Sequence, residues 1–214
     1  MTAGKKSIFN RLRDEHIDAL QEIGNIGSGH AANALAEFLN RRIDMSLPRC
    51  NLLSIDEISK VEWRGQSVDV PFAEVFLETT GDLTLEVLVV FDTETVQNLL
   101  RLVRSIKLDV VLEELNRLDR SVIKEIGNIL ALHFITAMNT FIGTKSFPKP
   151  PTFIIETSET VLTSIANHFG PDIGHLLLIE CDIYTSDMKL SPLVIMIPTE
   201  ESTEETLKLL FGEV

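Results

Sequence analysis

The segment Leu20-Gln-Glu-Ile-Gly-Asn-Ile26 recurs 103 positions later as Ile123-Lys-Glu-Ile-Gly-Asn-Ile129. Self-similarity at one fixed offset is the signature of a duplicated structural unit. The same offset extends to the segments on either side, and no low-complexity linker separates the copies. We therefore expect two repeats, about 1–105 and 106–214, that together form a single domain, residues 1–214, with pseudo-twofold symmetry.

Each repeat is predicted to run long helix, strand, short helix, hairpin and final helix. Helical periodicity spans about 14–40 in the first repeat and about 113–141 in the second. Short helices are expected at 54–63 and 158–169, and the final helices at 93–104 and 204–210. Gly81-Asp82, between two apolar runs, is typical of a hairpin turn. Helices combined with hairpin-connected strands favour an α+β fold, here a mainly antiparallel sheet covered by the long helices.

The composition excludes several classes of function. With 214 residues and 44% hydrophobic residues, the chain is long enough for a substantial core. Its 32 acidic and 19 basic residues give a net charge of −13, which repels nucleic-acid phosphates and anionic lipids. The longest apolar runs are strand-sized, and the first ten residues lack the apolar stretch of a signal peptide. We expect a cytoplasmic protein with no nucleic-acid partner and no membrane insertion.

Each long helix carries one narrow polar stripe. At 100° per residue, Glu22 and Asn25 lie within about 40° of Asp18. The second helix repeats the stripe with Ser121, Glu125 and Asn128. The apolar residues lie on the opposite side of both helices, and we expect them to be buried: Leu20, Ile23, Gly27, Ala31, Ala34 and Phe38 in the first, and Ile123, Ile126, Leu130, Phe134, Ala137 and Phe141 in the second.

A polar stripe on a half-buried helix is usually only its solvated face. Here, however, the Glu and the Asn recur at the same places in both repeats. Other positions on the polar side differ freely, as Gln21 differs from Lys124. A solvated face has no physical need to keep a Glu and an Asn three residues apart, so we predict one functional site in each repeat.

The two motifs resemble the D/S-x3-E-x2-N-x22-P pattern of the CheC/CheX/FliY family of chemotaxis response-regulator phosphatases. They read Asp18-x3-Glu22-x2-Asn25-x22-Pro48 and Ser121-x3-Glu125-x2-Asn128-x22-Pro151. The resemblance covers both repeats and implies a CheC-like fold. It also implies a hydrolase that acts on the aspartyl phosphate of a CheY-type response regulator. The catalytic residues would be Glu22, Asn25, Glu125 and Asn128, with Asp18, Ser121, Pro48 and Pro151 supporting the motif.

The implied chemistry suits these residue types. An acyl phosphate is already activated, so one Asn amide that both donates to and accepts from a water is enough to align the attack. Glu22 or Glu125, as a fixed anion, would hold a lysine of the partner rather than act as a general base. The Mg²⁺ is expected on the response regulator, and no cofactor is expected on this chain. Its five histidines and two cysteines show no zinc-binding spacing.

Gly24-x-x-Gly27-x-Gly29 resembles a phosphate-cradling loop, but the glycines have the wrong order and lie inside a helical pattern. We interpret them as small residues that allow a close approach between the helix and its partner. The second repeat keeps only Gly127 and has Leu132 in place of Gly29, which makes the two sites unequal in composition. Pro48 and Pro151 are expected to precede the next strand of each repeat.

Two alternatives remain. The stripes would only dock partners if the protein were a non-catalytic adaptor. Two-motif members of the family also bind the receptor deamidase CheD, and 158–169 would be the docking helix here. A structural role in a flagellar switch is disfavoured, since we expect no switch domain after Val214.

Overall fold

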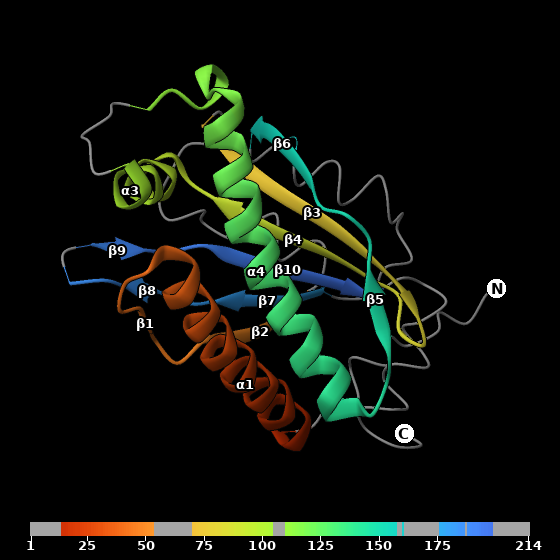
Figure 1. The fold of residues 1–214 in the computed structure, drawn as a ribbon. Helices are drawn as coiled ribbons and strands as arrows, with labels where there is room; N and C mark the ends of the chain where they lie inside the picture. Colours follow the sequence, from red (N-terminus) through yellow and green to blue (C-terminus); the bar gives the residue numbers. More distant parts are fainter. Residues whose placement is uncertain are drawn as a thin grey trace.

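The structure, a computed structural model, describes residues 14–53, 70–104, 110–157, 160, 176–186 and 188–198. Two long helices, α1 (Asp14–Leu39) and α4 (Arg117–Ile142), lie on one face of a mainly antiparallel sheet, with α3 (Thr93–Arg104) beside them (Figure 1). The strands are β1 (Asp44–Met45), β2 (Arg49–Leu53), β3 (Pro71–Gly81), β4 (Leu85–Phe91), β5 (Ser146–Pro148), β6 (Thr152–Thr157), β7 (Leu176–Glu180), β8 (Ile183–Tyr184), β9 (Lys189–Leu190) and β10 (Leu193–Pro198).

The order of strands in the main sheet carries the symmetry of the sequence. The order is β2-β7-β10-β4-β3, and β5 and β6 both pair with β3. In the repeat, β2 corresponds to β6, β3 to β7 and β4 to β10, so the order from β2 to β6 reads the same from either end. The pseudo-twofold axis therefore lies between β4 and β10, where Val89 pairs with Val194. This confirms the α+β class and the internal duplication.

The repeats are interlaced rather than side by side. β2 of the first repeat pairs with β7 of the second, in the register Cys50 to Ile179. β6 of the second repeat pairs with β3 of the first, in the register Ala73 to Ile155. Each repeat therefore completes its part of the sheet only with strands of the other.

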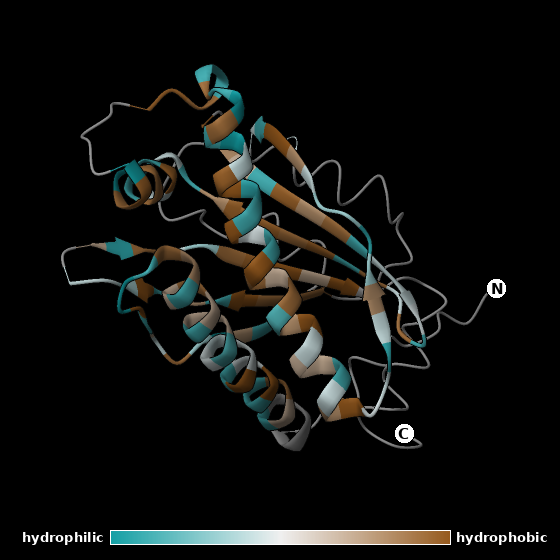
Figure 2. Ribbon diagram, in the orientation of Figure 1, coloured by the Kyte–Doolittle hydropathy of each residue, from teal (hydrophilic) through white to brown (hydrophobic). Residues whose placement is uncertain are grey.

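The two long helices lie side by side on the sheet and run in opposite directions (Figure 1). A Cβ atom on Gly27 would lie 2.5 Å from Cδ1 of Phe134, and one on Gly127 would lie 2.6 Å from Cβ of Val75. His30 and His133, which correspond in the repeat, meet edge to face with ring centroids 6.2 Å apart. Hydrophobic residues fill the central strands, whereas both long helices alternate hydrophobic and hydrophilic residues (Figure 2).

The helix α4 begins later than its periodicity predicted. The Asn116 Oδ1 atom accepts hydrogen bonds from the amides of Leu118 (2.9 Å) and Asp119 (3.0 Å), which fixes the first turn at Arg117. The preceding Leu112–Glu114 forms a separate 3-10 turn, η2. Asp119 is buried and pairs with Arg104 at 2.6 Å, which ties the end of α3 to this first turn.

The burial of Phe38 and Phe141 was predicted wrongly, since these side chains are 44% and 41% exposed. The buried stripe of α1 advances four residues at a time, from Ile23 to Leu35. Each such step turns the stripe by about 40° around the helix. By the last turn the stripe has therefore rotated away from Phe38, and α4 repeats the same drift.

Three other expectations fall on parts of the chain that the structure does not describe. The helices predicted at 54–63 and 204–210 lie outside the described residues, as does 158–169 except for Thr160. Among the described helices, α4 is long and apolar enough to span a membrane by length and composition. That is weak evidence of a span, because the buried side of α4 packs on β3 as a core helix does.

The outer face of the sheet, opposite the long helices, buries the carboxyl group of Glu74. Glu74 on β3 is 3% exposed among apolar side chains that include Phe72, and its Oε1 atom has no hydrogen-bond partner in the described part of the chain. Burial, with a smaller contribution from the charge of Glu156, raises the pKa of Glu74 to about 8. The group is therefore protonated at neutral pH.

Replacing Glu74 by Gln should remove a pH dependence of stability. The folded-state pKa of about 8 lies above the reference value of 4.5, so between these values the folded protein holds a proton that the unfolded chain has lost. Stability of the parent protein should therefore fall as pH rises. Urea unfolding at pH 6 and pH 9 measures the free energy of unfolding of both proteins. From pH 6 to pH 9, the value for Glu74→Gln should rise by about 2–3 kcal/mol relative to that of the parent. An equal pH dependence in both proteins would contradict the assignment.

Substitution of two glycines should distinguish the effect of close packing against the sheet from the effect of helix propensity on stability. Gly127→Ala should destabilise the fold by about 1–3 kcal/mol, because the new methyl group meets Val75. Gly29→Ala is the matched control, since a Cβ atom there meets nothing within 4 Å. It should stabilise the helix by up to about 1 kcal/mol. Denaturant unfolding measures both, and equal effects of the two changes would refute the packing argument.

Candidate functional site

The structure places the predicted site residues along one face of each long helix. In α1, Asp18 and Glu22 are exposed and Asn25 is half-buried. In α4, Ser121 and Glu125 are exposed and Asn128 is half-buried. The two Glu–Asn pairs therefore have matching surroundings, but they stand on different helices and are not combined into one site.

The Ile-Gly pair between each Glu and Asn faces inward. Ile23 and Ile126 are completely buried, and a Cβ atom on Gly24 would lie 3.1 Å from Cγ of Pro48. Pro48 is itself buried and stands just before β2. The spacing from Asn25 to this proline therefore brings the chain back beneath the same helical turn. Pro151 precedes β6 in the same way and is half-buried.

Gln21 joins the helix to the edge strand at the first site. Its Nε2 atom donates to the carbonyl oxygen of Pro48, and its Oε1 atom accepts from the amide of Cys50 at 3.4 Å. The Nε2 atom also lies 3.5 Å from Oδ1 of Asn25, at the outer limit of a hydrogen bond. Gln21 was interpreted as a freely varying solvent position. That interpretation is wrong, because the side chain is half-buried and connects Asn25 to β2.

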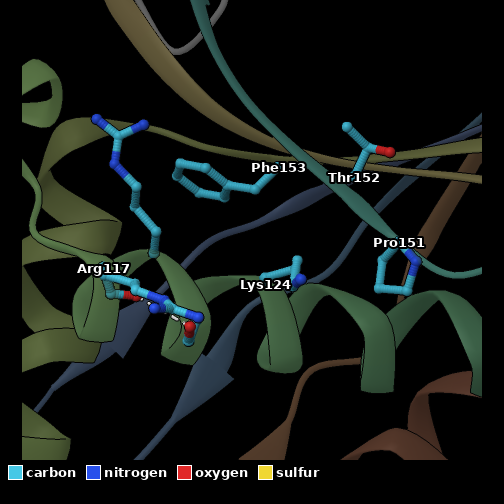
Figure 3. A pocket seen from close by; sticks show the side chains of 7 residues that line it. Arg117, Lys124, Pro151, Thr152 and Phe153 are labelled. Atoms are coloured by element: carbon cyan, nitrogen blue, oxygen red, sulfur yellow. Dashed lines mark hydrogen bonds between the residues drawn. The ribbon is translucent and has the colours of Figure 1, made fainter.

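A pocket of about 650 Å³ adjoins the second site. The first turns of α4 form one wall, with Arg117, Arg120, Ser121 and Lys124, and the chain entering β6 forms the other, with Pro151, Thr152 and Phe153 (Figure 3). This pocket was not predicted from the sequence, although the basic residues at 117, 120 and 124 recur at helical spacing and are a signal for it.

The comparisons with known proteins identify the family. The sequence model of the CheC-like family matches residues 15–52 and 118–155, which contain both motifs. The protein named CheY-P phosphatase CheC from Bacillus subtilis is 32% identical over 204 residues, which is 93% of this chain and 95% of that protein. The chain belongs to the CheC-like family.

Solved structures show the same fold in proteins of lower identity. FliY of Thermotoga maritima superposes on this CheC-like chain with a TM-score of 0.68 at 19% identity, covering 94% of this chain and 99% of FliY. The middle domain of FliM from H. pylori superposes with a TM-score of 0.63 at 9% identity, covering 92% and 99%. These likenesses concern the fold alone.

Other reactive groups near the sites have limited chemistry. Burial raises the pKa of the Cys50 thiol to about 11, so this thiol beside Gly24 is protonated and a poor nucleophile at neutral pH. In the described part of the chain, no three His, Cys, Asp or Glu side chains gather in a way that could hold a metal ion.

Replacing Gln21 by Ala should loosen the contact between α1 and β2. The Pro48 carbonyl and the Cys50 amide each lose a partner, so we expect a loss of about 1–2 kcal/mol in stability and faster hydrogen exchange of the Cys50 amide. Lys124→Ala is the matched control, because Lys124 occupies the equivalent position and makes no such hydrogen bond to the described residues. Unchanged exchange at Cys50 in Gln21→Ala would contradict this role.

Proposed function

We propose that this CheC-like protein hydrolyses the aspartyl phosphate of a CheY-type response regulator, with Glu22–Asn25 and Glu125–Asn128 as its two catalytic pairs. The observation that carries the proposal is the repeated pairing of an exposed Glu with a half-buried Asn on the face of each long helix that is turned away from the core. Family membership and the name of the Bacillus subtilis relative support the substrate class.

The Asn of each pair would position the attacking water. The water attacks phosphorus, the phosphorus–oxygen bond to the aspartyl carboxylate breaks, and inorganic phosphate leaves. The oxygen of a side-chain amide can accept a hydrogen bond from this water, and its NH2 group can donate another to it. Together these hydrogen bonds align the water for in-line displacement. Partial burial restricts the amide of Asn25, and the contact of Gln21 with Oδ1 orients it further.

The exposed Glu of each pair would contact the partner rather than the phosphorus. A carboxylate next to a phosphoryl group repels it, but it attracts a lysine that the regulator holds there. We propose this role for Glu22 and Glu125. The Mg²⁺ belongs to the regulator in this scheme, so the present chain needs to supply no metal ligands.

The remaining predicted residues have supporting roles in the proposal. Asp18 and Ser121 extend the exposed stripe toward the docked regulator, and Pro48 and Pro151 hold the chain beneath it. The interlaced sheet supports treatment of residues 1–214 as a single domain of two repeats. We propose that the protein acts in the cytoplasm, where response regulators are phosphorylated.

The second candidate function is that of a non-catalytic adaptor for the regulator or for CheD. The helix predicted to dock CheD, 158–169, lies outside the described residues apart from Thr160. The exposed polar stripes suit docking as well as catalysis, so the adaptor function has to be separated by experiment.

Replacing both Asn25 and Asn128 by Ala should reduce regulator dephosphorylation by about 100-fold or more, because the water is no longer aligned. Decay of a radiolabelled phosphoregulator with and without the protein measures the rate. A double variant that hydrolyses at the parental rate would exclude these residues as catalytic. Binding that depends on phosphorylation while the phosphate lifetime is unchanged by the parent protein would establish the adaptor instead.

A further inference from the structure

The pocket beside the second pair is basic in a strongly acidic chain. Three cationic side chains, Arg117, Arg120 and Lys124, line its helical wall, while the whole chain carries a net charge of −13. Ser121 lines the same pocket and belongs to the stripe that continues to Glu125 and Asn128. The pocket therefore opens beside the proposed catalytic pair.

One of the three cations is already engaged within the protein. The Arg120 Nε atom donates to the carbonyl oxygen of Leu115 at 2.8 Å, and a guanidinium nitrogen donates to that of Glu113 at 3.2 Å. The guanidinium also lies over the ring of Phe153, 5.7 Å from its centroid. Arg120 thus builds the pocket, because it fixes the aromatic side chain of β6 against the helix.

The other two cations are available to a ligand. Neither the Arg117 guanidinium nor the Lys124 ammonium group has an ion pair or side-chain hydrogen bond with any described residue. Basic side chains elsewhere commonly have carboxylate partners: Arg42 with Asp44, Arg49 with Glu180, Arg104 with Asp119, Lys149 with Glu78 and Lys189 with Asp182. Figure 3 shows Arg117 and Lys124 on the helix across from Phe153 and Thr152.

The shape and chemistry of the pocket suit a polypeptide better than a small anion. Its volume of about 650 Å³ far exceeds that of an inorganic phosphate ion. Pro151 and Phe153 give it an apolar wall. Outside the lining, Leu118 in the first turn of α4 is 63% exposed. Two free cations beside apolar surface fit an acidic segment that also carries apolar side chains.

The first repeat lacks this arrangement. The residues equivalent in sequence to Arg117, Arg120 and Lys124 are Asp14, Ile17 and Gln21. Three positive charges are thus replaced by one negative and two neutral residues, and Gln21 is engaged with β2. An acidic segment would be repelled there rather than attracted.

We propose that the pocket formed by Arg117, Lys124 and Phe153 docks an acidic segment of the phosphorylated response regulator, next to Glu125 and Asn128. The inference rests on the proposed phosphatase function and assigns the docking surface of its second site. Charges at the rim of an interface act mainly on the association rate and its salt dependence. The pocket therefore acts on KM and leaves the chemical step to the Glu–Asn pair.

The test uses the full chain with Asn25→Ala, so that only the second site contributes. Adding Arg117→Gln and Lys124→Gln should raise KM for the phosphoregulator about tenfold, change kcat less than twofold and weaken the dependence of kcat/KM on salt. Lys145→Gln is the matched control, since this exposed lysine lies beyond the opposite end of α4. It should keep the KM and salt dependence of the Asn25→Ala protein. Thermal unfolding checks that each variant folds.

Several results would overturn the inference. If the Asn25→Ala protein accelerates dephosphorylation but the added changes leave KM and its salt dependence unaltered, the pocket is not the docking surface, while the proposed function stands. If inorganic phosphate inhibits through Arg117 and Lys124 without any change in KM for the regulator, the pocket is a product site. Absence of hydrolysis in the unmodified protein would instead refute the proposed function itself.

Discussion

The close approach of the two long helices to the sheet is the constraint on which the rest of the structure depends. Gly127 brings α4 against Val75, and Gly24 brings α1 against Pro48 and Cys50. In each helix the glycine and the isoleucine before it face the sheet, so the Glu and the Asn on either side of them must face outward. The recurring Glu-Ile-Gly-Asn sequence therefore specifies helix packing and site geometry together. Any residue larger than glycine there would move the pair that it supports.

Much of this fold could be predicted because the duplication and the helical period are local signals. The repeat at an offset of 103 predicted the symmetric sheet, and periodicity predicted α1 and α3 almost to the residue. The errors arose where a long-range contact or a stereochemical detail determines where a helix begins or which side chains are buried. Asn116 starts α4 by capping it, which periodicity cannot see, and the buried stripe rotates along each helix as it follows the sheet, which exposes Phe38 and Phe141.

The candidate sites were predictable only in their repeated part. Recurrence of Glu and Asn distinguished them from a solvated face, but Gln21 and Lys124 differ between the repeats and so looked unimportant. The partners of Gln21 lie 27 and 29 residues away, at Pro48 and at Cys50 on the strand that follows it. No local pattern predicts such contacts. In a duplicated protein, a position that differs between the two copies is therefore not always without function. It can instead have a separate function in each copy.

Gln21 and Lys124 also show how a symmetric scaffold comes to hold unequal sites. At this helical position a side chain can turn inward to the edge strand or remain available at the mouth of the pocket, but it cannot do both. Gln21 satisfies the outward-facing amide of Cys50 on the edge strand β2 and so orders the first site. In the second repeat, Arg120 and its contact with Phe153 join the helix to the edge strand β6 instead. This leaves Lys124 without a partner among the described residues, so the two sites share the Glu–Asn pair but differ in what can approach them.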